Sequence, residues 1–216
     1  MFDYHDTGDL VEENLFVNCN SGSEIVSIKS SSSTFRYNTV RHSTGDIDIR
    51  SGRRDAIYGN YLLGPGGGGI RMYEDDHRIF NNYVETGSAL QMGPGHAGHA
   101  PVTNAVVVFN TFVGAVSASG TGNTIANNVV VGGGGLAGPG NLVGSAAALG
   151  LARMGELLVP TAASKVVGAA MGTFPFVIDD VAGHPRTRAD VGAQQVASEP
   201  PLRRPLTPAD VGPDAP

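Results

Sequence analysis

The 216-residue sequence contains no tryptophan, a single cysteine and only 16% charged residues. With Cys19 alone no internal disulfide can form, and we expect this residue to be a small packed side chain. No run approaches the roughly 18 apolar residues of a transmembrane helix, and the net charge of −6 argues against nucleic-acid binding. The absences therefore exclude a disulfide-stapled chain and argue against nucleic-acid and membrane partners.

Glycine, in contrast, is abundant, with 31 residues. Together with the low charge, it favours many short strands joined by tight turns over long charged helices. A chain of this length with 41% hydrophobic residues can bury one sizeable core, and we interpret it as one elongated domain. The first ten residues, MFDYHDTGDL, have neither the basic start nor the apolar core of a signal peptide.

A short motif recurs along the first 130 residues. It consists of an apolar residue, an asparagine two or three positions later, and an apolar residue two positions after that. The asparagine intervals of 24, 22, 22, 28 and 18 residues match one coil of a parallel solenoid. Asparagines at one place in every coil can stack and satisfy turn backbone groups. A β-sandwich is the alternative, but its strands rarely repeat an identical motif. The asparagines are Asn14, Asn38, Asn60, Asn82, Asn110 and Asn128.

A second column of residues lies out of phase with the asparagines. Lys29, Arg50, Arg71 and Gln91 follow at intervals of 21, 21 and 20, each directly after an apolar residue. If the apolar residue points into the core, its neighbour in the strand points outward. We therefore expect Lys29, Arg50 and Arg71 to form a cationic ladder on an exposed sheet. Exposed strand cations can also serve only solubility and edge protection. Like charges repel across neighbouring strands, however, so the ladder favours a binding track for a polyanion.

Four blocks carry a resemblance to a known family. EIVSIKS (24–30) is followed by Asn-Thr (38–39), IRSG (49–52) and GGIR (68–71). With these blocks in this order, residues 13–85 resemble the catalytic region of polysaccharide lyase family 6, the alginate lyases and chondroitinase B. The resemblance implies a right-handed parallel β-helix and cleavage of a uronic acid polymer by β-elimination. It also implies a secreted or periplasmic protein that acts on an acidic polysaccharide, with alginate the first choice and dermatan sulfate the second.

The same resemblance gives roles to individual residues. Removing the C5 proton of a uronate requires a base and a group that stabilises the charge spreading onto the C6 carboxylate. Lys29 matches the base, and its neutral form would be favoured by the like charge of Arg50 nearby. Arg50 matches the proton donor to the glycosidic oxygen, although a guanidinium is a poor acid. Arg71 would hold a carboxylate of the polymer. Tyr73 and His77 would border the sugar groove or belong to a polar turn.

Calcium is a cofactor that the resemblance suggests and that the residues support only in part. The resembled enzymes often hold calcium with two glutamates two positions apart and an asparagine from an earlier coil. Glu24 matches the second glutamate, but Gly22 occupies the first position and the earlier coil would precede Met1. Because calcium takes six to eight oxygen ligands, Glu24 is only a candidate ligand. Ser51 stands where the family has a histidine, which removes one contact expected in the site.

Two glycine-containing stretches invite other interpretations. GPGGGG (64–69) lacks the Gly-Lys-Ser/Thr ending of a phosphate loop, so we expect a loop between coils. HAGH (96–99) offers His96 and His99 as metal ligands. It lies, however, in the insertion that lengthens one asparagine interval to 28, which favours a solvated loop.

The repeat fades after Asn128. Residues 145–159 are rich in alanine and leucine and predict one short helix. Residues 176–195 resemble the closing segment of right-handed β-helix proteins, where an Asp-x-x-Gly-x-x-Arg stretch precedes Asp-x-Gly-Ala. Residues 198–216 are proline-rich with few large apolar side chains, which predicts a disordered tail. Residues 1–197 then form a partial β-helix domain that keeps its C-terminal closure but begins in mid-helix.

Two function hypotheses follow. The first is a lyase acting on alginate or dermatan sulfate, with Lys29 and Arg50 as the chemical pair. The second is a non-catalytic polyuronate-binding remnant that uses the same cationic ladder without a complete cleft. A β-helix adhesin is disfavoured, because its exposed face would not need a lysine and an arginine at this separation. Formation of an unsaturated product that absorbs ultraviolet light distinguishes the lyase from the binder.

Overall fold

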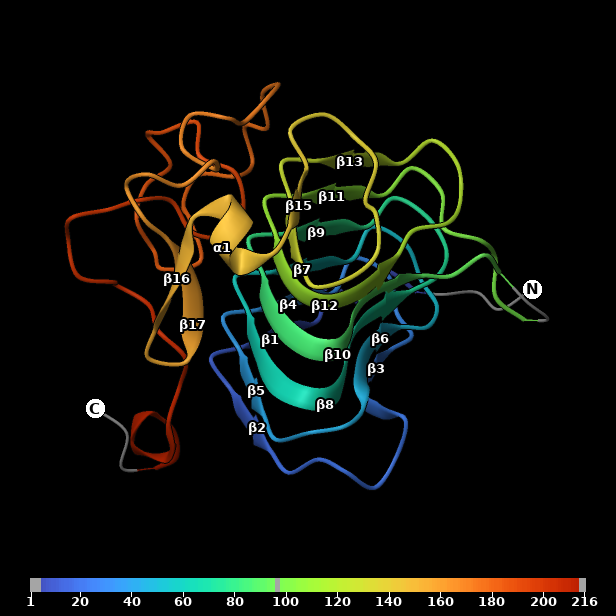
Figure 1. Ribbon diagram of the computed structural model, residues 1–216. Coiled ribbons are helices and arrows are strands. Elements are labelled where there is room, and N and C mark those ends of the chain that lie inside the picture. The colour runs from blue at the N-terminus through green and yellow to red at the C-terminus, as the bar shows by residue number, and fades with distance from the viewer. Residues whose placement is uncertain (1–4, 96–97, 214–216) are drawn as a thin grey trace.

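The computed structural model describes residues 5–95 and 98–213, and most of its strands stack as coils of a parallel β-helix (Figure 1). The first sheet has the order β1 (Leu10–Glu12), β4 (Thr34–Arg36), β7 (Ala56–Tyr58), β9 (Arg78–Phe80), β11 (Val106–Val108) and β13 (Thr124–Ala126). The second has the order β15 (Leu142–Gly144), β14 (Val129–Val131), β12 (Thr111–Ser117), β10 (Tyr83–Met92), β8 (Tyr61–Met72), β5 (Thr39–Arg41) and β2 (Leu15–Val17), and β3 (Glu24–Ile28) and β6 (Asp46–Ile49) continue it. Pairing within both sheets is parallel, which confirms the predicted right-handed parallel β-helix.

The second sheet bends sharply, and β8 and β10 pass round the bend without a break (Figure 1). The start of β8 pairs with β5 and its end pairs with β6. The GPGGGG stretch lies inside β8 and is not the expected loop. Close packing requires glycine at Gly67, Gly68 and Gly69, and a Cβ on Gly68, for example, would lie 2.2 Å from Oδ1 of Asp46. Glycine therefore lets the strand turn the corner against its neighbour.

Apolar side chains that point inward form one core along the axis of the coils. Ile47, Ile70 and Leu90 are in register on successive coils and are fully buried. Ile57 and Ile79 stack in the same way on the first sheet. Burial of each such side chain contributes about 1.5–3 kcal/mol. Because strand residues alternate between faces, this core turns the residues between them outward.

The asparagines form the predicted ladder at the turn between the two sheets. In Asn60, Nδ2 donates hydrogen bonds to Oδ1 of Asn82 (2.9 Å) and to the carbonyl oxygens of Phe35 and Tyr58 (both 3.0 Å). The backbone N–H of Asn38 donates in turn to Oδ1 of Asn60 (2.9 Å). The ladder extends one rung beyond the sequence motif, and its members are Asn14, Asn38, Asn60, Asn82, Asn110, Asn128 and Asn141.

The residue before each of the first six ladder asparagines has a left-handed backbone. These residues are Glu13 (φ 58°), Tyr37 (φ 56°), Gly59 (φ 67°), Asn81 (φ 52°), Phe109 (φ 55°) and Asn127 (φ 57°). This conformation costs a non-glycine residue about 1–2 kcal/mol. The hydrogen bonds of the adjacent asparagine offset that cost at every turn.

The predicted helix over residues 145–159 is wrong beyond its first turn. Helix α1 covers only Ala146–Leu149, and an antiparallel hairpin of β16 (Leu151–Met154) and β17 (Leu157–Pro160) follows. Gly150 ends the helix with a left-handed φ of 75°, where a Cβ would lie 2.8 Å from Cα of Ser164. Neither α1 nor the short 3₁₀ helix η1 (Pro208–Asp210), the helices of the described residues, is long enough to cross a bilayer.

After the hairpin the chain runs back along the side of the coils, which Figure 1 shows in orange and red. Its contacts span the coils from the last to the first. In chain order Met171 contacts Asn127, Val181 contacts Tyr61, Ala193 contacts Thr111 and Leu206 contacts Thr39, so the chain passes along the coils more than once. Arg186 of the predicted closing motif is at its centre, where it donates to Oδ1 of Asn81 (2.9 Å) and lies 4.4 Å from the centre of the Phe109 ring. We call residues 171–213 the return segment.

The end of the return segment contradicts the predicted disorder of residues 198–216 as far as residue 213. The backbone N–H of Leu206 donates to Oγ1 of Thr39 (2.8 Å), and its carbonyl oxygen accepts from Arg41 (2.9 Å). Arg203 forms an ion pair with Asp179 at 2.6 Å. Backbone hydrogen bonds and arginine contacts hold this segment, and a composition-based prediction does not count such interactions.

Asn60→Ala should lower the free energy of unfolding by about 3 kcal/mol, because it leaves buried backbone groups on two coils without partners. Asn14→Ala, at the exposed first rung, should cost about 1 kcal/mol or less. Urea denaturation of both variants measures the difference. Equal effects would show that the ladder does not stabilise the interior coils.

Deletion of residues 198–216 should lower the melting temperature by about 4–8 °C, because contacts to the first coils worth about 2 kcal/mol are lost. A shorter deletion that starts at Gly212 retains the Leu206 and Arg203 contacts and is the matched control. Thermal unfolding followed by circular dichroism compares the two truncated chains. An unchanged melting temperature for the longer deletion would restore the disordered-tail interpretation.

Candidate functional site

The outer side of the bend, where β3, β6 and β8 lie side by side, carries the charged residues singled out from the sequence. Their arrangement differs from the predicted cationic ladder. Asp48 of β6 is in register with Arg71 of β8, and Arg71 is in register with Gln91 of β10. Arg71 thus belongs to a different column from Lys29 and Arg50. The predicted ladder is wrong at this rung because the bend lengthens the coil.

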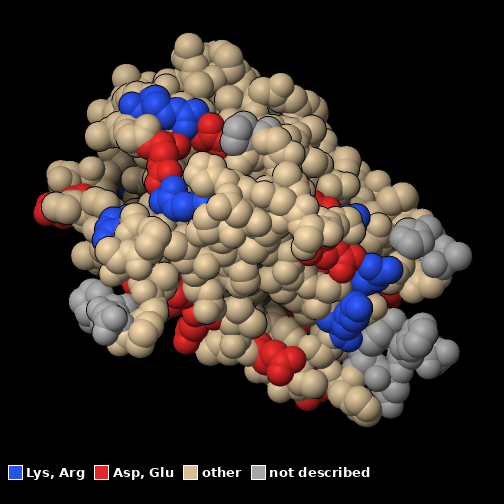
Figure 2. Space-filling model, turned by 90° about the horizontal axis from the view of Figure 1, so that it is seen from below, with Lys and Arg blue, Asp and Glu red and all other residues tan. Residues whose placement is uncertain are grey.

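Acidic and basic side chains lie side by side on the molecular surface (Figure 2), as Asp48 and Arg71 do in this column. Figure 2 shows lysine and arginine side chains beside aspartate and glutamate side chains on the face seen from below. Most basic side chains on this face lie beside acidic ones, and further acidic side chains lie near its lower edge (Figure 2). At the site itself Arg50 pairs with Glu24 and Arg71 pairs with Asp48, so it is a network of ion pairs and not a bare cationic track.

The backbones of Lys29 and Arg50 lie next to each other on adjacent coils, as predicted from their spacing. Ile28 is in register with Ile49, so the residues that follow them lie on adjacent rungs, and the N–H of Arg50 donates to the carbonyl oxygen of Ile28 (3.0 Å). The two side chains border different hollows. Lys29 is exposed and lines a hollow of about 150 Å³ together with Asp9, whereas Arg50 lines a pocket of about 200 Å³.

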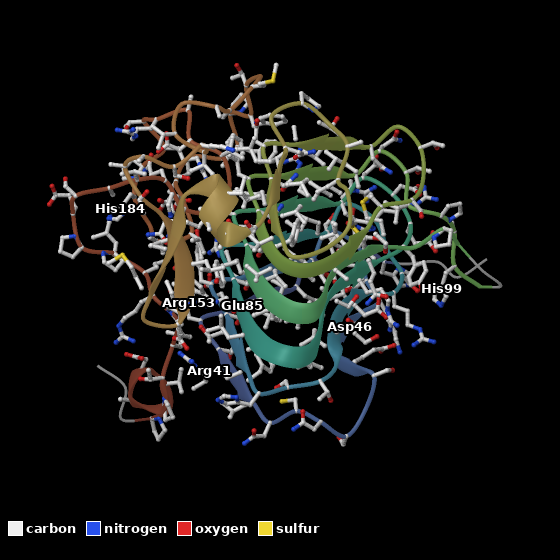
Figure 3. The ribbon with its side chains drawn as sticks, viewed as in Figure 1. Arg41, Asp46, Glu85, His99, Arg153 and His184 are labelled. Carbon is white, nitrogen blue, oxygen red and sulfur yellow. The ribbon has the colours of Figure 1, made fainter. Side chains whose placement is uncertain are left out.

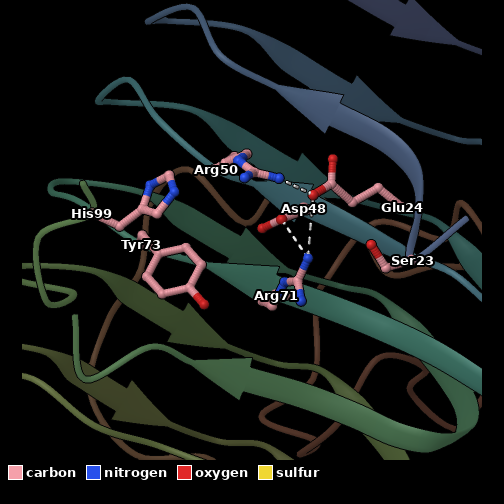
Figure 4. Close-up of a pocket in the computed structure, with 7 residues that line it drawn as sticks. All are labelled: Ser23, Glu24, Asp48, Arg50, Arg71, Tyr73 and His99. Carbon is pink, nitrogen blue, oxygen red and sulfur yellow. Dashed lines mark hydrogen bonds and ion pairs between the residues drawn. The ribbon is translucent and has the colours of Figure 1, made fainter. Parts of the chain in front are cut away.

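The pocket beside Arg50 contains a compact set of charges (Figure 4). Oε1 of Glu24 accepts hydrogen bonds from Arg50 (2.5 Å) and Arg71 (3.4 Å). Arg71 also donates to Oδ2 of Asp48 (2.7 Å) and lies 3.6 Å from Oδ2 of Asp46. The lining residues are Ser23, Glu24, Asp48, Arg50, Arg71, Tyr73 and His99.

The three carboxyl groups differ in how readily they ionise. Burial raises the pKa of Asp46 and of Asp48, and the nearby Arg71 compensates only in part. Burial also acts to raise the pKa of Glu24, but hydrogen bonds from Ser27 and Arg50 outweigh it and the pKa is lowered. Glu24 is therefore the carboxylate of this pocket that most strongly keeps its charge.

The rings of Tyr73 and His99 line the side of the pocket that faces Glu24 (Figure 4). The ring of Tyr73 stacks on the imidazole of His99 with centroids 5.0 Å apart, and Figure 4 shows both beside Arg50. A Cβ on Gly93 would lie 2.2 Å from the Tyr73 ring, so glycine is required there. Tyr73 thus borders this pocket, and its contact with a sugar stays a prediction.

Four residues of this site are not predicted from the sequence, and one other residue is placed wrongly. The four are Ser23, Asp46, Asp48 and His99. His99 was assigned to a solvated loop, and its partner His96 lies outside the described residues. The sequence contains a signal for Asp46 and Asp48, because the side chains of residues two apart in a strand lie on the same face. The stretch GDIDIR therefore turns both aspartates outward with its isoleucines inside.

His77 is the misplaced residue, because it cannot border a sugar groove. Its side chain is fully buried. Its Nδ1 accepts a hydrogen bond from the N–H of Asp55 (3.2 Å), and its Nε2 bonds to the carbonyl oxygen of Tyr73 (2.7 Å). Burial lowers the pKa of His77 to about 4, so the imidazole is neutral and has a structural role.

A calcium ion does not fit the residues present here. Among the described residues, no group of three histidine, cysteine or acidic side chains is arranged to hold a metal ion. Gly22 offers no side-chain oxygen, and the carboxylates of Glu24, Asp46 and Asp48 converge on the guanidinium of Arg71. This guanidinium supplies the positive charge that a metal would otherwise bring.

Comparisons with known proteins agree with this fold. The family model for chondroitinase B matches residues 4–132, and no curated protein matches the chain. A mannuronic acid specific polysaccharide family 6 lyase from human gut microbiota is 20% identical, with a TM-score of 0.50 over 65% of this chain and 37% of that chain. A family 6 polysaccharide lyase from Pseudopedobacter saltans is 20% identical (TM-score 0.52, 95% and 54%), and a family 6 alginate lyase is 18% identical (TM-score 0.53, 90% and 32%).

The chain spans between about a third and about half of the length of these solved structures. At such identities the likeness shows the shared β-helix fold alone. The family model, in contrast, covers more than half of the chain, including β3, β6 and β8, which carry the pocket. The chain therefore belongs to the chondroitinase B family of polysaccharide lyases.

Proposed function

We propose that this protein cleaves a uronic acid polymer by β-elimination, with alginate as the preferred substrate. One observation carries the proposal: Lys29 and Arg50 follow paired residues on adjacent coils, beside a pocket that contains a second guanidinium, Arg71. The reaction needs this combination of a base and fixed positive charge. The similar solved structures include an alginate lyase and a mannuronic acid specific lyase, which supports alginate as the first polymer to test.

In the proposed reaction a uronate lies across the bend with its C6 carboxylate toward Arg50 and Arg71. The amine of Lys29, in its neutral form, takes the proton from C5. The electrons of that C–H bond form a double bond between C4 and C5, and the glycosidic oxygen on C4 leaves with the neighbouring part of the chain. That oxygen takes a proton from the guanidinium of Arg50, which before this transfer stabilises the negative charge on the carboxylate together with Arg71. Tyr73 borders the sugar.

The same proposal places the protein outside the cytoplasm, because alginate and dermatan sulfate are extracellular polymers. Its partner is then an acidic polysaccharide bound at the bend. Incubation with alginate and, separately, with dermatan sulfate tests the proposal, because each elimination creates a C=C bond that absorbs ultraviolet light. A lack of absorbance with both polymers would overturn it.

One observation favours a second candidate function, a non-catalytic polyuronate-binding protein. The side chain of Lys29 borders a different hollow from that of Arg50. A binder needs the guanidinium groups but not a base that faces them. Binding of alginate without any gain in absorbance would identify this function.

Lys29→Ala should reduce turnover by about 100-fold to 10,000-fold, the range for a positioned acid or base. Polymer affinity should weaken only modestly, since Arg50 and Arg71 remain. Lys29→Arg should be nearly as damaging, because an arginine keeps the charge but does not release its proton near neutral pH. Initial rates of absorbance increase give turnover. Near wild-type elimination by Lys29→Arg would show that Lys29 only binds.

Treatment with EDTA should leave activity on alginate within about twofold of the untreated rate, because Arg71 already neutralises the carboxylates that would bind a metal. The control is EDTA saturated with calcium, which keeps the additive but removes its chelating capacity. Loss of activity with free EDTA, reversed by added calcium, would reveal ligands outside the described arrangement.

A further inference from the structure

Glu24 occupies a position that a substrate carboxylate would need. One of its oxygens, Oε1, accepts hydrogen bonds from both Arg50 and Arg71. These are the groups that the proposed reaction directs at the polymer. We infer that Glu24 is an internal competitor for the uronate carboxylate, so that a bound polymer must displace it from Arg50. This inference rests on the proposed function and adds a residue that determines affinity at the same site.

A β-bulge holds Glu24 in this place. Glu24 is in register with Asp46, but the next pair joins Val26 to Ile47, so Ile25 has no partner in the ladder. Without the bulge, strand alternation would turn Glu24 to the inward side together with Val26. The extra residue moves its carboxylate to the outer side, next to the arginines.

Gly45 on the neighbouring coil lets the backbone of Glu24 lie close to that coil. A Cβ on Gly45 would lie 2.9 Å from the backbone carbon of Glu24, nearer than real Cβ atoms come. The position of Glu24 is thus built into the backbone of two coils. It does not depend on a side-chain rotamer alone.

Arg50 is the group that gains most when Glu24 leaves. Arg71 retains Asp48 at 2.7 Å, whereas among the described residues Glu24 is the one acidic side chain that forms an ion pair with Arg50. The side chain of Arg50 is 44% exposed and that of Glu24 is 17% exposed, so the pair faces the pocket and water. A polymer carboxylate can therefore replace Glu24 on Arg50 without unfolding any strand.

The charge count of the pocket supports the same conclusion. Three carboxyl groups, those of Glu24, Asp46 and Asp48, face two guanidinium groups, those of Arg50 and Arg71. Such a balance gives a polyanion little net attraction while Glu24 stays paired. Removal of the negative charge of Glu24 makes the pocket more positive, which strengthens its attraction for the polymer.

The test compares Glu24→Gln with Glu85→Gln, which changes the net charge equally. Glu85, near the start of β10, pairs with Arg153 at 2.7 Å, and Figure 3 shows both residues on the other side of the bend from Asp46 and His99. Calorimetry with an alginate oligosaccharide should show about tenfold tighter binding for Glu24→Gln, equivalent to about 1.4 kcal/mol. Glu85→Gln should stay within about twofold of wild type.

A double variant separates competition for Arg50 from a general charge effect. In an Arg50→Ala background, Glu24→Gln should lose most of its gain, because the contested group is absent. A full tenfold gain in that background, or equal gains for Glu24→Gln and Glu85→Gln, would overturn the inference.

The remaining outcomes are equally decisive. Unchanged or weaker binding by Glu24→Gln would mean that Glu24 holds Arg50 in place and does not compete with the polymer. That result leaves the proposed function intact as long as wild type binds alginate. No binding by wild type or by either variant would overturn the proposed function and this inference together.

Discussion

The asparagine ladder is the interaction on which the rest of the structure depends. Each rung ties a turn to the next coil through both a backbone N–H and a side-chain amide, as Asn60 does with Asn82. The ladder therefore fixes how each coil sits on its neighbour, and strand register follows from it. Register in turn decides which polar residues meet on the outer face, since a shift by one residue would turn every side chain to the other side.

The return segment stabilises this stack along its whole length. Its contacts connect the last coil near Asn127 with the first coils near Thr39. A solenoid contacts only its nearest neighbours from coil to coil, so its ends separate easily. A segment that spans several coils couples them, and half-buried Arg186 holds its middle against Asn81 and Phe109.

The pocket at the bend shows how such a scaffold presents charge. The tight turn of β8 at its glycine run brings Arg71 beside Asp48 and Asp46. The bulge in β3 adds Glu24 from the other side. Carboxylates and guanidiniums are thereby held close enough to neutralise one another, and we propose that an anionic polymer binds by exchange of partners. Polar side chains in a site of this kind act as a network, so a change in one alters the others.

The sequence by itself determined the fold and part of the site. The spacing of the asparagines and the inward isoleucines predicted the coils, because a solenoid repeats the same local hydrogen bonds in each turn. The separation of Lys29 and Arg50 was retained as adjacent rungs, since both directly follow residues that face each other in the structure. These features depend on interactions between neighbouring coils, and such interactions require the same residue types at regular intervals in the sequence.

Tertiary structure alone decided the rest. Three features of the site depend on interruptions of the repeat. The bend places Arg71 opposite Asp48, and the bulge turns Glu24 outward. The insertion before Asn110 brings His99 onto Tyr73. His77 shows the same limit, because its polarity indicated a surface while its hydrogen bonds to Asp55 and Tyr73 satisfy it inside. The return segment is ordered in spite of the composition of its end, since residues there bind partners far away in the chain, such as Leu206 and Thr39 (167 residues apart). Contacts at such separation have no local signal.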